Sequence, residues 1–221
     1  MSRTNKKSIK KARRTQVERR AESGLGLVKA AIAVAGRDGV TAATFEAIGR
    51  EAGYSRSLVT QRFGSKQGLT DAVIAFLHER LESILTDNQV DQMSGLDALM
   101  AYMDLFLRSL EPDGELRAYF MLLSSAVAEA TPLRTAFATH HERVRQRMAA
   151  FIVAGQEEGC ILPEIDADSA ALIVGSLQLG LAMQLLVDPT MNLEPVRKTA
   201  LASVRRSFAT PRSDSQNKEV S

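Results

Sequence analysis

The sequence predicts an all-α protein, and three observations support this fold class. Apolar side chains recur at the three-to-four-residue spacing of amphipathic helices along most of the 221 residues, and no segment alternates convincingly as a strand does. Hydroxyl or carboxylate residues stand where helices would begin, and Gly or Pro follow where they would end. A hydrophobic fraction of 45% is sufficient for an ordinary buried core. We therefore expect helices packed on helices.

Four helices are expected in the N-terminal third, two of them short. Gly39 is suited to end the first helix, because glycine readily adopts the left-handed conformation that often follows a helix. Thr44, Ser55 and Ser65 are placed to cap the next three, since a side-chain oxygen there accepts a hydrogen bond from the first turn. The expected ranges are 14–37, 45–52, 56–63 and 66–86.

Five further helices are expected in the remainder. Pro112, Pro132 and Pro189 mark their ends, and Pro195 suits the first turn of the last one. The expected ranges are 95–110, 114–129, 133–158, 166–187 and 195–207. The segment 170–187 carries no charge, but it contains Ser and Gln and is short for a span of about 20 apolar residues. We interpret it as a helix buried on most sides.

Charge is divided unevenly along the chain. Residues 1–66 hold 15 Lys and Arg against 5 Asp and Glu, whereas the remaining residues hold 13 against 21. A basic N-terminal third is typical of proteins that bind a polyanion, although a charged terminus is also commonly a solvated tail. We expect residues 1–16 to form a flexible basic arm that follows phosphates when DNA is present, and residues 209–221 to be a disordered tail.

Residues 44–63 have the layout of a helix-turn-helix, in which the second helix enters the major groove. Val59 and Phe63, four residues apart, would face inward and anchor that helix against Ile48. Outward Arg can pair with guanine, Gln with adenine, and hydroxyls and Lys with phosphates. The predicted DNA-contacting residues are Thr44, Ser55, Arg56, Ser57, Thr60, Gln61, Arg62 and Lys66. The alternative is a pair of short helices with polar outer faces and no DNA.

The segment "LVKAAIAVAGRDGVTAATFEAIGREAGYSRSLVTQRFGSKQGL" resembles the DNA-binding domain of TetR/AcrR-type transcriptional regulators. The matching residues are Ala30-Ala31, Gly39, Thr44, Ile48, Ala52-Gly53, Ser55-Arg56, Phe63 and the "SKQGL" that opens the fourth helix. The resemblance covers roughly residues 17–77. Family members usually carry Tyr, a large residue and His where this chain has Thr60, Gln61 and Arg62, so its sequence preference is expected to be its own.

The resemblance implies a helical domain over residues 78–208 that binds a ligand and dimerises through the last two long helices. Small and apolar residues recur on those helices at helical spacing, which supports a homodimer, and an intramolecular core is the alternative. The predicted interface residues are Val174, Gln178, Leu181, Leu185, Val196, Ala200 and Val204. A two-fold dimer would read a palindrome with half-sites about 34–36 Å apart.

The resemblance also implies an effector pocket among the middle helices. The candidate lining residues are Met103, Phe106, Phe120, Phe137, His141 and Met148. A Met and Phe stripe is more often plain core, and His141 is more often a hydrogen-bonded core histidine than a polar anchor for a ligand. The effector is expected to be small and apolar.

The sequence therefore predicts a cytoplasmic, homodimeric repressor of a palindromic operator, released by a small molecule. An activator or a DNA binder of low specificity is the alternative within transcription. A helical enzyme or carrier with an incidental basic arm is the alternative of another class, but the sequence has no phosphate loop, nucleophile elbow or metal spacing. With three His and Cys160 as the single Cys, we predict no catalytic residue, metal or cofactor, and a reducing compartment.

Overall fold

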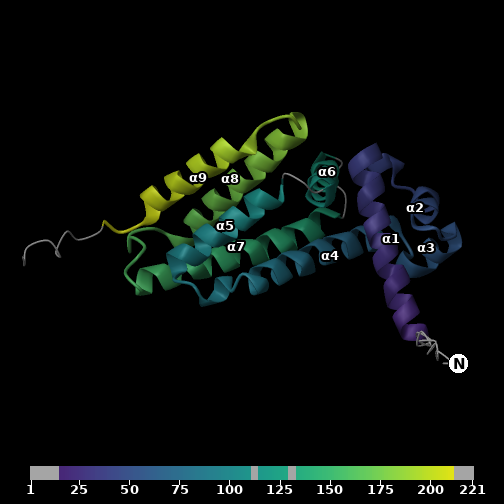
Figure 1. The fold of residues 1–221 in the computed structure, drawn as a ribbon, viewed down its shortest axis with the longest axis horizontal. Coiled ribbons are helices and arrows are strands. Elements are labelled where there is room, and N and C mark those ends of the chain that lie inside the picture. The colour runs from purple at the N-terminus through teal and green to yellow at the C-terminus, as the bar shows by residue number, and fades with distance from the viewer. Residues whose placement is uncertain (1–14, 111–113, 129–132, 212–221) are drawn as a thin grey trace, which may run out of the picture.

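A computed structural model describes residues 15–110, 114–128 and 133–211 of the chain, so most of the expected basic arm and tail lie outside the described residues. The described residues form nine α-helices and two short 3₁₀ turns, with one isolated bridge between Ile161 and Ala209. The predicted all-α class is confirmed. Figure 1 shows a small helical bundle at one end, a longer helical body at the other, and α4 running from one into the other.

The N-terminal bundle follows the predicted capping residues closely. The Oγ atoms of Thr44, Ser55 and Ser65 accept hydrogen bonds from backbone N–H groups in the first turns of α2, α3 and α4. Gly39, with a φ of +92°, separates α1 from a 3₁₀ turn that the sequence did not predict. The elements are α1 (Gln16–Asp38), η1 (Val40–Ala42), α2 (Phe45–Ala52), α3 (Arg56–Phe63) and α4 (Lys66–Asp87).

The body contains the five remaining helices and a second 3₁₀ turn. Asp166 and Asn192 cap its last two helices. The final helix begins at Leu193, two residues before the predicted start, because Asn192 is the capping residue; Pro195 is still in the first turn, where its missing N–H costs little. The elements are η2 (Val90–Gln92), α5 (Gly95–Ser109), α6 (Gly114–Ala128), α7 (Leu133–Glu157), α8 (Ala167–Val187) and α9 (Leu193–Phe208).

Two glycines allow the body helices α5 and α7 to approach closely. A Cβ atom added to Gly95 would collide with the backbone of Gly155, and one added to Gly155 would lie 2.6 Å from a methyl carbon of Ile161. The Gly95 N–H also donates to a carboxylate oxygen of Glu158 at 2.8 Å. The start of α5 is therefore fixed against the end of α7.

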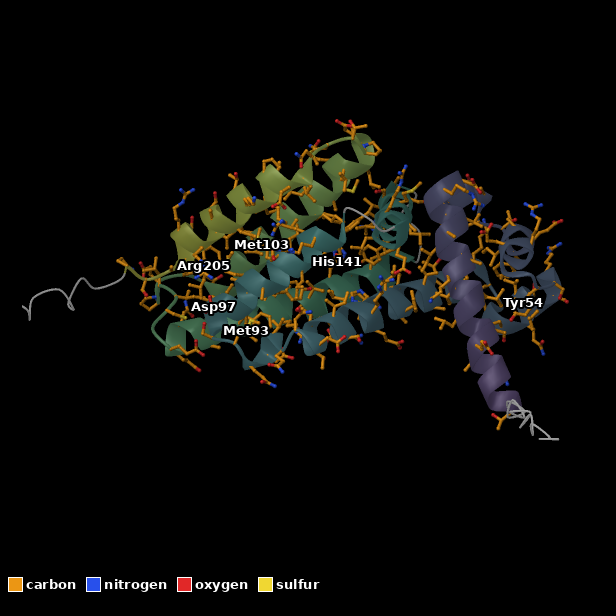
Figure 2. All side chains as sticks on the ribbon, in the orientation of Figure 1. Tyr54, Met93, Asp97, Met103, His141 and Arg205 are labelled. Atoms are coloured by element: carbon orange, nitrogen blue, oxygen red, sulfur yellow. The ribbon has the colours of Figure 1, made fainter. Side chains whose placement is uncertain are left out.

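Ion pairs fix α9 along α5. Arg197 is largely buried, and its guanidinium pairs with Asp104 on α5 and with Glu194 on its own helix. One turn from the end of α9, Arg205 pairs with Asp97 at 2.7 Å, and Figure 2 shows this pair toward the end of the body that is far from the N-terminal bundle. The helix is thus held by charge as well as by its apolar face.

The helix α8 is the most apolar of the described helices. Within the described residues it is the one helix that is long and apolar enough to cross a membrane by length and composition, with a mean hydropathy of 1.9. Only 28% of that apolar window is buried within a single chain. The prediction that this helix is buried on most sides is therefore wrong for one chain: α8 packs against α7, α6 and α5 on one side and exposes the other.

Candidate nucleic-acid interface and effector cavity

The turn between α2 and α3 is set by backbone contacts. Gly53 ends α2 with a φ of +72°, and the Tyr54 N–H donates back to the Gly49 carbonyl at 2.7 Å. A Cβ atom on Gly49 would lie 2.7 Å from the Tyr54 carbonyl oxygen, so glycine allows this close approach. The backbone itself therefore fixes the direction in which α3 leaves the turn.

Apolar contacts anchor α3 from below. Val59 and Ile48 are fully buried in the common core, and Phe63 is half-buried against it. This is the inward face that the four-residue spacing of Val59 and Phe63 predicts. The opposite face of α3 is polar and open to solvent, as a reading surface requires.

All eight predicted DNA-contacting side chains are exposed, but several also serve the local fold. Thr44 and Ser55 cap α2 and α3, Ser57 shares a 2.8 Å hydrogen bond with Ser55, and the Thr60 hydroxyl donates to the Arg56 carbonyl. Within the described residues, Arg56, Gln61 and Lys66 have no side-chain hydrogen bond or ion pair. These three long side chains are therefore free to meet base edges or phosphates.

Arg62 differs from its polar neighbours on α3. A Cβ atom added to Gly24 of α1 would lie 2.5 Å from Arg62 Nη2, so the guanidinium lies directly on the surface of α1. The sequence prediction counted Arg62 among the DNA-contacting residues and could not show that it folds back onto α1. Tyr54, which the sequence prediction did not single out, lies at this turn and is 39% exposed. Figure 2 labels it on the N-terminal bundle. Its phenol adds a hydrogen-bonding group beside α3.

The body contains an apolar cavity of about 220 Å³ beside the N-terminal bundle. Helices α4 to α8 all contribute to its wall. Four of the six predicted pocket residues line it, namely Phe106, Phe120, His141 and Met148. Met103 and Phe137 do not line it. Both are buried in the core, so for these two residues the alternative of a core role is the one observed. Figure 2 shows His141 toward the end of the body nearest the bundle.

The polar atoms of the cavity wall are few. His141 Nε2 and the Tyr119 hydroxyl are hydrogen-bonded at 3.1 Å. His78 also lines the cavity, and its ring stacks on His140 with centroids 4.0 Å apart. Burial lowers the pKa of His78 to about 4 and lowers the pKa of His141, so both imidazoles are neutral at pH 7. No group of His, Cys, Asp or Glu among the described residues is arranged to hold a metal ion.

Two helices connect the cavity with the DNA-binding end. The helix α4 supplies Leu77, His78 and Leu81 to the cavity wall and packs against α1 and α3 nearer its start. The helix α6 supplies Tyr119 and Phe120 and packs against α1 and η1. Figure 1 shows α6 standing between the body and α1. The same two helices therefore contact both the cavity and the N-terminal bundle.

Comparison with known proteins identifies the N-terminal domain. The family model described as "Bacterial regulatory proteins, tetR family" matches residues 27–73, which include α2, α3 and parts of α1 and α4. Residues 27–73 therefore form a TetR-family DNA-binding domain. Its helix-turn-helix is the DNA-binding element, and the family consists of regulators and not of enzymes. No curated protein matches the sequence.

Solved structures share the fold over nearly the whole chain. A TetR-family regulator from Rhodococcus sp. has 21% identity and a TM-score of 0.74 over 86% of this chain and 100% of its own. The SmeT–triclosan complex has 24% identity and a TM-score of 0.74 over 86% and 93%; SmeT is the repressor of a Stenotrophomonas maltophilia efflux pump. A Saccharomonospora viridis regulator in complex with choline has 20% identity and a TM-score of 0.70 over 86% and 100%.

The outer face of α8 is apolar and open. Leu172, Ile173 and Leu177 are 60%, 64% and 36% exposed. Four of the predicted interface residues, Val174, Gln178, Ala200 and Val204, are instead buried within the chain, and for these the intramolecular-core alternative is the observed one. The three others, Leu181, Leu185 and Val196, are half-buried. The helix is apolar on every side, so its period could not indicate which side faces outward.

Proposed function

We propose that this TetR-family regulator is a homodimeric repressor that binds a palindromic operator and is released from it by a small apolar effector. The carrying observation is the exposed polar face of α3 above its buried anchor Val59. Two structural relatives, SmeT and NalD of Pseudomonas aeruginosa, are named as repressors of multidrug efflux pumps. A DNA-binding role also implies a cytoplasmic location.

The domain bounds proposed from the sequence suit this function. Residues 17–77 would form the DNA-binding domain and residues 78–208 the effector-binding and dimerisation domain. Arg56 and Gln61 are assigned to base edges, because their side chains have the guanine- and adenine-pairing geometries and no partner among the described residues. Lys66, in the first turn of α4, is assigned to a phosphate beside the N–H groups that begin that helix.

The proposed dimer forms through the exposed face of α8. On that strip of α8, Leu172, Ile173 and Leu177 are exposed apolar side chains, and a second copy would remove them from water. A C₂ pair would bring identical strips together, as isologous interfaces do. The two α3 helices would then address half-sites about 34–36 Å apart, or one turn of DNA.

Release from DNA would be caused by movement of the helices that connect the cavity with the N-terminal bundle. An effector in the cavity contacts α4 and α6, both of which pack against α1. If the ligand fits best when those helices are displaced, its differential affinity favours a dimer whose α3 helices no longer match the groove spacing. SmeT and the Saccharomonospora viridis relative, solved with triclosan and choline, support an effector role for this body.

Fluorescence anisotropy with the intergenic DNA beside the gene tests the proposed function. The purified full chain is expected to bind that fragment in preference to unrelated DNA of the same length. Arg56→Ala should weaken binding by about tenfold or more, as the loss of a bidentate base contact does. Arg143→Ala, which removes an exposed arginine of α7, is the matched control and should bind as the wild type does.

Two results would contradict the proposal. Equal competition by unrelated DNA would indicate a binder of low specificity, and unchanged binding by Arg56→Ala and Gln61→Ala would remove α3 from the reading surface. Transcription from the same promoter with and without the protein would separate repression from activation. Turnover of a bound ligand would instead favour an enzyme.

A further inference from the structure

We propose that the effector of this cavity is an uncharged, single-ring-sized apolar molecule with a hydrogen-bond acceptor that meets the side-chain amide of Gln178. The inference rests on the proposed effector role of the cavity and specifies the chemical class. It is carried by one buried, unpaired amide in a mostly apolar wall.

Gln178 is a polar residue inside the core. It is 4% exposed, lines the cavity, and its Nε2 atom is buried without a hydrogen-bond partner. A buried amide donor left unpaired is costly, and native proteins usually satisfy it by protein, water or ligand. The amide on α8 therefore offers a donor to whatever fills the cavity.

A second unpaired atom lies in the same wall. His78 Nε2, on α4, is buried without a partner and belongs to a neutral ring. Depending on its tautomer, this nitrogen accepts or donates one hydrogen bond. The cavity thus offers two polar points on different helices. A carbonyl, ether or hydroxyl oxygen can occupy the first, and a second polar group on the ligand can meet the other.

The charged residues of the wall argue against an ionic ligand. Arg80 pairs with Glu115, and Arg145 pairs with Glu142 at 2.6 Å and with Asp168. The imidazole of His141 is neutral and is already bonded to Tyr119. An anion or cation would have to leave water for an apolar cavity whose charges are satisfied, which is strongly unfavourable.

The volume limits the size of the ligand. A cavity of about 220 Å³ exceeds the roughly 150 Å³ of an engineered cavity that binds benzene. It is smaller than the roughly 300 Å³ at which drug-sized sites begin. One ring with a short chain therefore fits this space.

Isothermal titration of the full chain with four matched probes tests the inference. The probes share a phenyl ring on a short chain: butylbenzene, butyrophenone, 4-phenylbutylamine and 4-phenylbutyrate. We expect butyrophenone to bind about tenfold more tightly than butylbenzene, because its carbonyl accepts from Gln178. The amine and the carboxylate should bind more weakly than butylbenzene.

Variants decide whether Gln178 is responsible for the preference. In Gln178→Met, which keeps the length of the side chain and removes the donor, the ratio between the two neutral probes should fall to about one. Gln178→Leu is a second test should the first variant be misfolded, as judged by its circular dichroism and melting. Ser109→Ala is the control from the same wall, because its hydroxyl already donates to the Phe106 carbonyl. It should retain the preference.

Several outcomes would overturn the inference. They are equal binding of the two neutral probes, an unchanged ratio in both Gln178 variants, tighter binding of either ion, or binding of none of the four. DNA binding is measured separately on the unliganded chain. A chain that binds its promoter but fails this test has the wrong ligand class, whereas a chain that passes this test but does not bind DNA contradicts the proposed function.

Discussion

The two regions proposed to bind DNA and an effector hold their polar groups in opposite ways. On α3, Arg56 and Gln61 are exposed above an apolar anchor, and they need no partner from the protein because water solvates them. In the cavity, the Nε2 atoms of His78 and Gln178 are buried and unpaired. The polar groups on α3 are therefore solvated when DNA is absent. The two nitrogen atoms in the cavity wall lack a hydrogen-bond partner until something else supplies one. Removing Arg56 or Gln61 should therefore affect DNA binding alone, whereas removing His78 or Gln178 should also change stability.

The largest expected effect is the loss of the anchor beneath α3. Ile48 is fully buried against the core, so Ile48→Ala should lower the free energy of unfolding by about 2–5 kcal/mol. DNA affinity should fall with it, because α3 loses its support. Urea denaturation with parallel anisotropy measures both. Gln61→Ala is the contrasting variant, which should reduce affinity without moving the urea midpoint.

A pH series tests the buried histidine of the cavity. Burial lowers the pKa of His78 to about 4 in the folded chain, below the ordinary histidine value of 6.5. As pH falls, His78 is therefore protonated in the unfolded chain before it is protonated in the folded chain. Its contribution to stability is thus present above about pH 6.5 and is lost as pH falls toward 4. The change should be on the order of 1 kcal/mol, because the ring is partly exposed to solvent.

The control for this series is His78→Phe, which keeps a ring on His140 but cannot titrate. Its stability between pH 4 and 6.5 should decline less steeply than that of the wild type. The groups that face His78 are His140 and His141 with Arg143 on α7, and Tyr119 on α6. If the stability of His78→Phe and of the wild type declined equally with pH, one of those neighbouring groups would be responsible for the pH dependence instead.

The cap of the recognition helix should have a smaller effect. Ser55→Ala removes the acceptor for the Leu58 N–H and is expected to cost about 1 kcal/mol of unfolding free energy. Ser55→Asp, which restores an acceptor at the same position, should recover that stability. Recovery of folding without recovery of DNA affinity would show that Ser55 also contacts DNA, or that the added charge repels phosphates.

The smallest expected effect separates Arg62 from its neighbours. Because its guanidinium lies on α1 at Gly24, Arg62→Ala should change DNA affinity by less than about threefold, below the effect of losing a base contact. Anisotropy with the same promoter fragment measures this directly. A loss as large as that of Arg56→Ala would show that the side chain swings away from α1 to bind DNA.

Sequence patterns predicted the helices well because their signals are local. Thr44, Ser55 and Ser65 are caps in the structure, and the buried face of α3 follows from the spacing of Val59 and Phe63. For a helix that is apolar on all sides, the sequence could not predict which face packs against the protein and which faces outward. Periodicity cannot distinguish the inner from the outer side of α8, because no polar stripe marks the outer side.

The cavity illustrates the same limit at the level of single residues. The sequence prediction included Phe106, which lines the cavity, and Met103, which does not, since both are apolar residues on α5. His78 was missed, although it lies among the apolar residues Ile74, Leu77 and Leu81 at helical spacing, a signal that could have found it. Its unpaired nitrogen depends on the packing of helices that are distant in sequence, which no local pattern contains.

Selection of binding sites by the full chain from a pool of random duplex DNA tests whether α3 reads a palindromic operator. We expect the enriched sequences to share a palindrome with half-sites about 10 base pairs apart, centre to centre. The Arg56→Ala and Gln61→Ala proteins should lose preference at particular base pairs while keeping the spacing. Enrichment of no common sequence, or an identical motif for all three proteins, would contradict the assignment of α3 as the element that reads the operator.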